Sequence, residues 1–232
     1  MPLTIVERPS PNHDARAEGP VDILVMHYTG MKSAEEALAR LCDPEAKVSS
    51  HYTIDRDGTV YRHVAEDRRA RHAGVSFWAG VRDVNSRSIG IEIVNPGHEF
   101  GYIPFAEPQI AALIDLSRGI IARHPMIAPA RVVGHSDVAP NRKQDPGELF
   151  PWARLAEFGI GIWPRDPARA RGPIDAERFA TDLARFGYGV PPEIDWPLAD
   201  VTAAFQRHFR PSCINGIPDA ECQALLARLL AA

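Results

Sequence analysis

Two histidines and one aspartate stand where a metal-binding site could form. His27 ends the short apolar run DILVMH, and His135 ends a second short run, RVVGH. Asp145 lies ten residues beyond His135, in a loop that contains Pro140, Pro146 and Gly147. Two imidazoles and one carboxylate are a common ligand set for zinc, and a catalytic zinc keeps its fourth position open for water. The three residues are therefore candidates for a hydrolytic zinc site.

The spacing of these residues leaves an alternative open. The chain has 9 histidines, and His27 and His135 do not form a compact motif such as HExxH. A single histidine is more often a structural or exposed residue than a metal ligand. From the residues alone, a zinc site and a set of unrelated histidines both remain possible.

The elements that would position these residues are short strands that alternate with helices. Asp57-Gly58 stands between two β-prone runs, which predicts a hairpin, and Ser33 is a suitable N-cap for a helix. This alternation predicts an α/β domain with a central mixed β-sheet flanked by helices. Strands are expected at 22–27, 88–95 and 131–135, and helices from Ser33 to about Leu41 and over 107–123.

Glu92 lies in the expected strand SIGIEIVN. Ile89, Ile91 and Ile93 point to one face of this strand, and Glu92 points to the other. The alternative is a surface carboxylate on an edge strand. The three isoleucines indicate a central strand instead, which favours a functional role for Glu92.

The amino-acid composition of the chain changes after Trp163. The segment PRDPARARGP is rich in Pro, Arg and Gly, which is typical of a linker, and three amphipathic helical patterns follow it. We therefore expect a large domain over 1–165, a linker over 166–174 and a small three-helix domain over 175–232. The three helices are expected at about 175–186, 198–209 and 219–231.

Composition excludes several classes of protein. A formal net charge of −4 gives no case for a nucleic-acid partner. The sequence contains no run of about 18 apolar residues, so no membrane span is predicted. The first residues lack the pattern of a secretory signal, which predicts a cytoplasmic protein; a periplasmic chain whose signal had been removed would look the same. The cysteines Cys42, Cys213 and Cys222 argue against a disulfide framework, although Cys213 and Cys222 could pair. We expect a monomer.

Five segments occur in an order that resembles a known family. They are ILVMHYTG, SSHYTIDRDGTVYRHV, HAGVSFWAG, SIGIEIVNPG and VVGHSDVAPNRKQDPGELFPW. Together, over roughly residues 5–160, they resemble the N-acetylmuramoyl-L-alanine amidase type 2 family, in particular its AmpD- and AmiD-like branch. The resemblance implies the fold of peptidoglycan recognition proteins and zinc ligands at His27, His135 and Asp145. It also implies hydrolysis of the lactyl amide between (anhydro-)N-acetylmuramic acid and L-alanine, in peptidoglycan recycling or turnover.

The resemblance also implies roles for other residues. Glu92 matches the catalytic glutamate, and Lys143 matches a lysine that stabilises the oxyanion, although most loop lysines are simply solvated. His51, His72 and Trp78 are candidates for contact with muropeptides and anhydro-muropeptides. For each of these three, a structural or core position is an equally good interpretation.

Two residues differ from those common in the family, and the C-terminal residues show a further resemblance. Arg71 stands where many relatives have Trp, and Glu148 stands where many have Pro, which puts fine substrate preference in doubt. The last residues resemble part of a peptidoglycan-binding three-helix unit, which could bind wall fragments or simply dock on the larger domain. The alternative function is a recognition protein that binds muropeptides without cutting them. Such members characteristically lack a zinc ligand, whereas all three candidates are present here.

Overall fold

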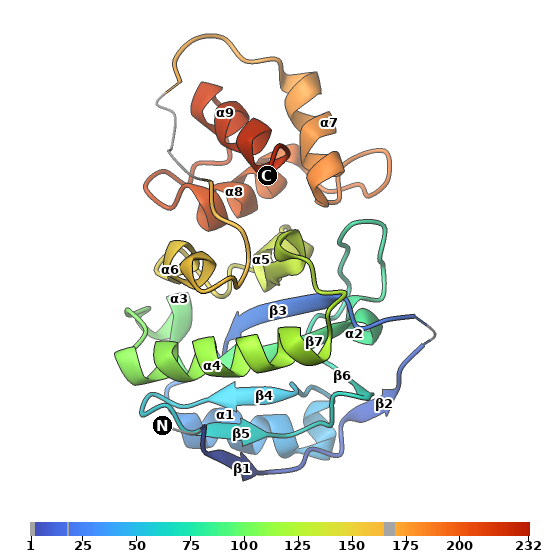
Figure 1. Cartoon of the computed structure of the whole chain (residues 1–232), viewed down its shortest axis with the longest axis vertical. Helices are drawn as coiled ribbons and strands as arrows, with labels where there is room; N and C mark the ends of the chain where they lie inside the picture. Colours follow the sequence, from blue (N-terminus) through green and yellow to red (C-terminus); the bar gives the residue numbers. More distant parts are fainter. Residues whose placement is uncertain (1–2, 18, 165–169) are drawn as a thin grey trace.

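A six-stranded mixed sheet forms the centre of the larger part of the molecule (Figure 1). The computed structural model describes residues 3–17, 19–164 and 170–232. β4 pairs antiparallel with β5 through the expected hairpin, and the β1–β5, β4–β7, β7–β3 and β3–β8 pairs are parallel. This arrangement confirms the expected mixed sheet. The strands lie in the order β1 (Ile5–Glu7), β5 (Val60–Arg62), β4 (Tyr52–Ile54), β7 (Ser88–Ile93), β3 (Ile23–Tyr28) and β8 (Val132–Gly134).

Helices and a second small sheet surround these strands. The Ser33 hydroxyl accepts a hydrogen bond from the Glu36 backbone N–H, and this cap starts α1 as expected. The long helix α4 (Glu107–Arg123) crosses in front of the sheet in Figure 1. The other elements of this part are β2 (His13–Ala15) paired with β6 (Arg68–Ala70), α1 (Ala34–Cys42), η1 (Pro44–Ala46), α2 (Val84–Arg87), α3 (Gly97–Phe100), η2 (Pro129–Arg131), α5 (His135–Val138) and α6 (Trp152–Glu157).

The two faces of the sheet have different environments. Leu24 and Met26 of β3 belong to a buried cluster that includes Leu113 of α4. Ile23 and Val25 belong to a second cluster, on the opposite face, because successive residues of a strand point to opposite sides. The same alternation puts His27 of β3 and Glu92 of β7, each one residue before the end of its strand, on this second face, which α4 does not cover.

Three further helices form a C-terminal helical unit, which we define as α7 (Ala176–Phe186), α8 (Leu198–Phe209) and α9 (Ala220–Leu229). They lie where the amphipathic patterns predicted them. Their buried side chains, such as Phe205, share one cluster with Val25 and Trp78 of the larger part. The unit therefore docks through a continuous apolar core. Residues 165–169 of the expected linker lie outside the described residues, and the division into two domains stays a prediction.

The cysteines and the helix lengths agree with two expectations from the sequence. Cys42, Cys213 and Cys222 are all unpaired, and Cys213 is exposed whereas Cys222 is buried. Within the described ranges, no helix combines the length and the apolar character needed to cross a bilayer.

Candidate metal centre

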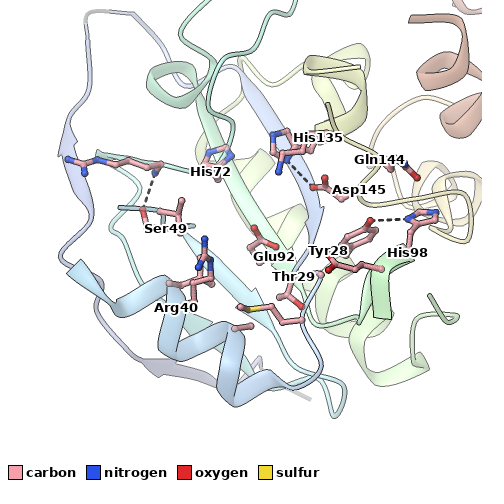
Figure 2. A pocket seen from close by; sticks show the side chains of 18 of the residues that line it. Tyr28, Thr29, Arg40, Ser49, His72, Glu92, His98, His135, Gln144 and Asp145 are labelled. Carbon is pink, nitrogen blue, oxygen red and sulfur yellow. Dashed lines mark hydrogen bonds and ion pairs between the residues drawn. The ribbon is translucent and has the colours of Figure 1, made fainter. Parts of the chain in front are cut away.

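The three predicted ligands meet at one end of the sheet. Figure 2 shows two of them, His135 and Asp145, side by side. Nδ1 of His27, Nδ1 of His135 and Oδ2 of Asp145 lie 3.0 Å from one another, and all three residues are buried. His27 is near the end of β3, and His135 follows the neighbouring parallel strand β8 directly. Parallel pairing thus brings together residues that are 108 positions apart in the chain. The Ser136 backbone N–H donates to the Asp145 carbonyl oxygen at 2.9 Å and brings the third ligand in.

Hydrogen bonds fix which ring nitrogen of His135 faces the centre. Its Nε2 lies 3.1 Å from the carbonyl oxygen of Ala73, which can only accept a hydrogen bond. Nε2 therefore carries the proton, and Nδ1 presents a lone pair to His27 and Asp145. A metal-binding histidine typically makes this kind of bond with its other nitrogen.

A chain of hydrogen bonds fixes His27 in the same way. The Ser88 hydroxyl donates to the Val84 carbonyl oxygen at 2.6 Å, so it accepts from Nε2 of His72 at 3.2 Å. Nδ1 of His72 then accepts from Nε2 of His27 at 3.0 Å. His27 is thus left with its Nδ1 lone pair directed at the other two ligands. His72 has room for this position because residue 90 is glycine, where a Cβ atom would lie 2.5 Å from the His72 ring.

Three acceptor atoms that face one another at short range fit a cation. A tetrahedral zinc with bonds of about 2.0–2.1 Å separates its ligand atoms by about 3.3 Å, close to the separation found here. Burial lowers the pKa of His27 to about 4, so its imidazole is neutral, as a ligand must be. Burial opposes ionisation of Asp145, but the nearby imidazoles of His135 and His27 hold its pKa below its usual range. The donor set therefore suits zinc.

Glu92 lies beside the ligands on the central strand β7. It is the register partner of His27 on β3, so the two Cα atoms are about 4.7–4.9 Å apart and their side chains share a face. Its Oε2 is buried and has no hydrogen-bond partner among the residues that the structure describes. Burial raises the pKa of Glu92 well above its usual value; Asp145 raises it further and Lys143 opposes the shift. A carboxyl group with a raised pKa is a stronger base than an ordinary carboxylate and is therefore suited to proton transfer.

A cavity of about 780 Å³ opens onto these groups from the face of the sheet that α4 does not cover. Glu92, His135 and Asp145 lie at its base, with Tyr28 and His98 at one side (Figure 2). Four of its lining residues carry positive charge, namely Arg40, Arg71, Arg142 and Lys143. The lining also contains three acidic residues, Glu92, Glu99 and Asp145, so the size and mixed charge of the cavity suit an extended polar ligand such as a short peptide.

The structure separates the other predicted site residues into two groups. Lys143 and His72 line the cavity, and His72 also supports His27. His51 is fully buried; its Nδ1 accepts from the Gly90 backbone N–H at 3.0 Å, so it holds the sheet together. Trp78 is 1% exposed, and its indole N–H donates to the Ala130 carbonyl oxygen. In place of the expected substrate contacts, the structure puts His51 and Trp78 in the core, the alternative that the sequence left open.

Several cavity residues were missed from the sequence, among them Tyr28, His98 and Arg142. The Tyr28 hydroxyl lies 2.9 Å from Nδ1 of His98, and Nε2 of His98 lies 3.1 Å from Glu148. The Arg142 guanidinium donates to the carbonyl oxygens of the loop at 73–75. Tyr28 follows the predicted ligand His27 and Arg142 precedes Lys143, so their position next to predicted site residues could have identified both. His98, in the short helix α3, has no such neighbour.

Comparisons with known proteins agree with this geometry. The family profile described as N-acetylmuramoyl-L-alanine amidase matches residues 17–148. The chain is 41% identical to the N-acetylmuramoyl-L-alanine amidase AmiD of Escherichia coli, over 90% of this chain and 82% of that protein. The 1,6-anhydro-N-acetylmuramyl-L-alanine amidase AmpD of Escherichia coli is 35% identical over 63% of this chain and 87% of its own length. The chain therefore belongs to the N-acetylmuramoyl-L-alanine amidase family.

Solved structures show the same relationship. Escherichia coli AmiD, in complex with the substrate anhydro-N-acetylmuramic acid-L-Ala-D-gamma-Glu-L-Lys, superposes with a TM-score of 0.83 and 41% identity. The superposition covers 93% of this chain and 90% of that one. AmpDh3 from Pseudomonas aeruginosa, in complex with anhydromuramic pentapeptide, gives a TM-score of 0.82 at 35% identity and covers 92% of this chain and 94% of that one. These coverages include the C-terminal helical unit, because the described residues before it are too few to account for them.

Proposed function

We propose that the protein is a zinc-dependent N-acetylmuramoyl-L-alanine amidase acting in peptidoglycan recycling or turnover. Its substrates are muropeptides, including anhydro-muropeptides, and it hydrolyses the amide between the lactyl group of the muramic acid and L-alanine. The observation that carries the proposal is the set of three converging lone-pair atoms with Glu92 beside them at the base of a cavity. Membership of the family, and two relatives solved with anhydromuramyl peptides, support the choice of substrate.

The ligands of the zinc ion would be Nδ1 of His27, Nδ1 of His135 and Oδ2 of Asp145. When bound, zinc supplies the Lewis acidity that polarises the scissile carbonyl and makes a water molecule nucleophilic near pH 7. The hydrogen bonds of His72 and Ala73 keep both imidazoles in the tautomer that this requires. The chain thus supplies a rigid donor set.

Glu92 moves the proton in this mechanism. As the water oxygen bonds to the lactyl carbonyl carbon, the Glu92 carboxylate takes the proton of the water. It then gives this proton to the amide nitrogen of L-alanine as the C–N bond breaks. The products are a free lactyl carboxylate on the sugar and a peptide with a free amino terminus. The raised pKa of Glu92 suits a group that must act first as base and then as acid.

Lys143 and His72 would assist at the cavity wall. The Lys143 ammonium would stabilise the negative charge that develops on the carbonyl oxygen during attack. His72 would act on His27 and could also reach the substrate, since it lines the cavity. The cationic residue Arg40 is placed to attract a carboxylate of the stem peptide.

The test is product analysis by mass spectrometry. Purified protein is incubated with anhydro-muropeptide and with intact sacculi, with and without a chelator, and zinc is then added back. We expect peptides with a free N-terminal alanine, loss of the products with chelator and recovery with zinc. Zinc binding without cleavage would instead support a muropeptide-binding protein. The cytoplasmic location and the monomeric state stay predictions, checked by cell fractionation and by light scattering.

A further inference from the structure

The segment that carries His135 is held by a buried carboxylate. Asp137 lies two residues after His135 in the single turn α5 and is fully buried. Its Oδ2 accepts the Gly134 backbone N–H at 2.7 Å. This bond joins the backbone on the two sides of His135 and so fixes the turn from which the imidazole projects.

The remaining partners of this carboxylate come from the C-terminal part of the chain. Nδ1–H of His208, in α8, donates to Oδ2 of Asp137 at 2.7 Å. The Tyr188 hydroxyl, just after α7, donates to Oδ1 at 2.6 Å. A buried carboxylate that loses such donors is left with unsatisfied acceptor oxygens, so the backbone around it shifts or admits water. The position of Asp137 therefore depends on His208 and Tyr188.

The ring of His208 is itself held in place. It stacks on Trp152 with centroids 3.8 Å apart and on Phe209 with centroids 3.9 Å apart. The preceding residue, Arg207, has its Nε 3.9 Å from Oε2 of Glu148, which lies three residues after Asp145. Successive residues of α8 thus approach both of the segments that carry the ligands His135 and Asp145.

We infer that the C-terminal helical unit positions the metal ligand His135 through the contacts of His208 and Tyr188 with Asp137. The unit is then part of the metal centre's support, with His208 and Tyr188 as positioning residues. This inference rests on the proposed zinc site and needs no binding of wall fragments by the unit. It predicts that a change 71 residues from Asp137 in sequence alters metal affinity.

The test measures the zinc dissociation constant of the full chain by competition with a chromogenic chelator. His208→Phe keeps the stacking and removes the donor, and Tyr188→Phe removes only the hydroxyl. We expect each variant to bind zinc about tenfold more weakly, the size of effect found when a supporting hydrogen bond is removed from a metal site. His208→Asn, whose amide nitrogen can replace Nδ1, should restore most of the affinity.

A matched control separates positioning from loss of stability. Leu225→Ala opens a cavity in the buried core of α9 and lowers the melting temperature without touching Asp137. It should leave the zinc dissociation constant unchanged. If folded His208→Phe and Tyr188→Phe bind zinc as wild type does, the unit is only docked and the inference is wrong. If wild-type protein binds no zinc at all, the proposed metal site fails as well.

Discussion

The proposed metal ligands come from two kinds of structure. His27 belongs to β3, which pairs along its length with β7 and over three residues with β8, so the backbone of this ligand is fixed by the sheet. His135 and Asp145 belong to a single helical turn and a loop, where few backbone bonds are available. Hydrogen bonds with side chains therefore hold the backbone of these two ligands in place, as the hydrogen bonds between strands do for His27. One site can thus combine a ligand held by the sheet with ligands held by tertiary contacts.

Removal of a ligand should have the largest effect on zinc binding and turnover. The effect should be the same for a ligand held by the sheet and for one held by tertiary contacts. His27→Ala and Asp145→Ala each leave two donors, so we expect loss of stoichiometric zinc and activity no higher than that of the chelated wild type. Elemental analysis and muropeptide turnover check this. A variant that retains zinc and full turnover would show that its residue is not a ligand.

A substitution of Glu92, on the strand β7, should reduce catalysis without reducing zinc binding. Glu92→Gln keeps the shape of the side chain and removes the proton acceptor, so we expect kcat to fall by about 10²–10⁴-fold while zinc stays bound. Single-turnover assays alongside zinc titration measure both quantities. Equal losses of zinc and of activity would contradict the role of Glu92 as base.

Support from the sheet side can be compared with support from α8. Ser88→Ala removes the group that accepts from His72, and with it the constraint on the tautomer of His27. We expect zinc affinity to fall by about tenfold, as for His208→Phe, because each variant acts on a ligand through one intervening residue. Near-wild-type affinity in Ser88→Ala alone would show that the ladder of β3 suffices to hold His27.

The smallest effect is expected far from the centre, where it serves as a reference. Despite the opposing effect of burial, hydrogen bonds from Arg123, His124 and Tyr52 lower the pKa of Glu66 from 4.5 to about 2. The stability that this gives is complete above pH 4.5 and is lost as the pH falls towards 2. Glu66→Gln should therefore lower the free energy of unfolding by about 1–3 kcal/mol at pH 7, and the difference should shrink at low pH. Denaturant unfolding measures it, and an unchanged zinc dissociation constant is expected.

Much of the centre was predictable because strand ends and short motifs carry local signals. His27, His135 and Glu92 stand at strand positions whose hydrophobic pattern is clear, and the structure puts them together as expected. Local pattern could not separate His72 from His51, since both flank β-prone runs and only packing decides which one reaches the cavity.

Trp78 shows why the remaining features were not predictable. An aromatic residue in a glycine-rich loop is typical of a binding groove. Tyr188, more than a hundred residues further on, covers this one, with ring centroids 4.8 Å apart. The contact of His208 with Asp137 depends on the same docking. A contact between distant segments is fixed by how whole elements pack, which neither residue's neighbours in sequence report.

The backbone bond from Ser136 to Asp145 has a consequence for metal uptake. It closes the ten-residue excursion between the two ligands, so His135 and Asp145 form a single clip. If these residues bind zinc as proposed, a metal ion that meets this clip finds two donors at a high effective concentration, because most of the loop-closure entropy has already been lost during folding. Uptake then requires only that the clip and His27 close on the same ion, and this favours tight retention at low free zinc.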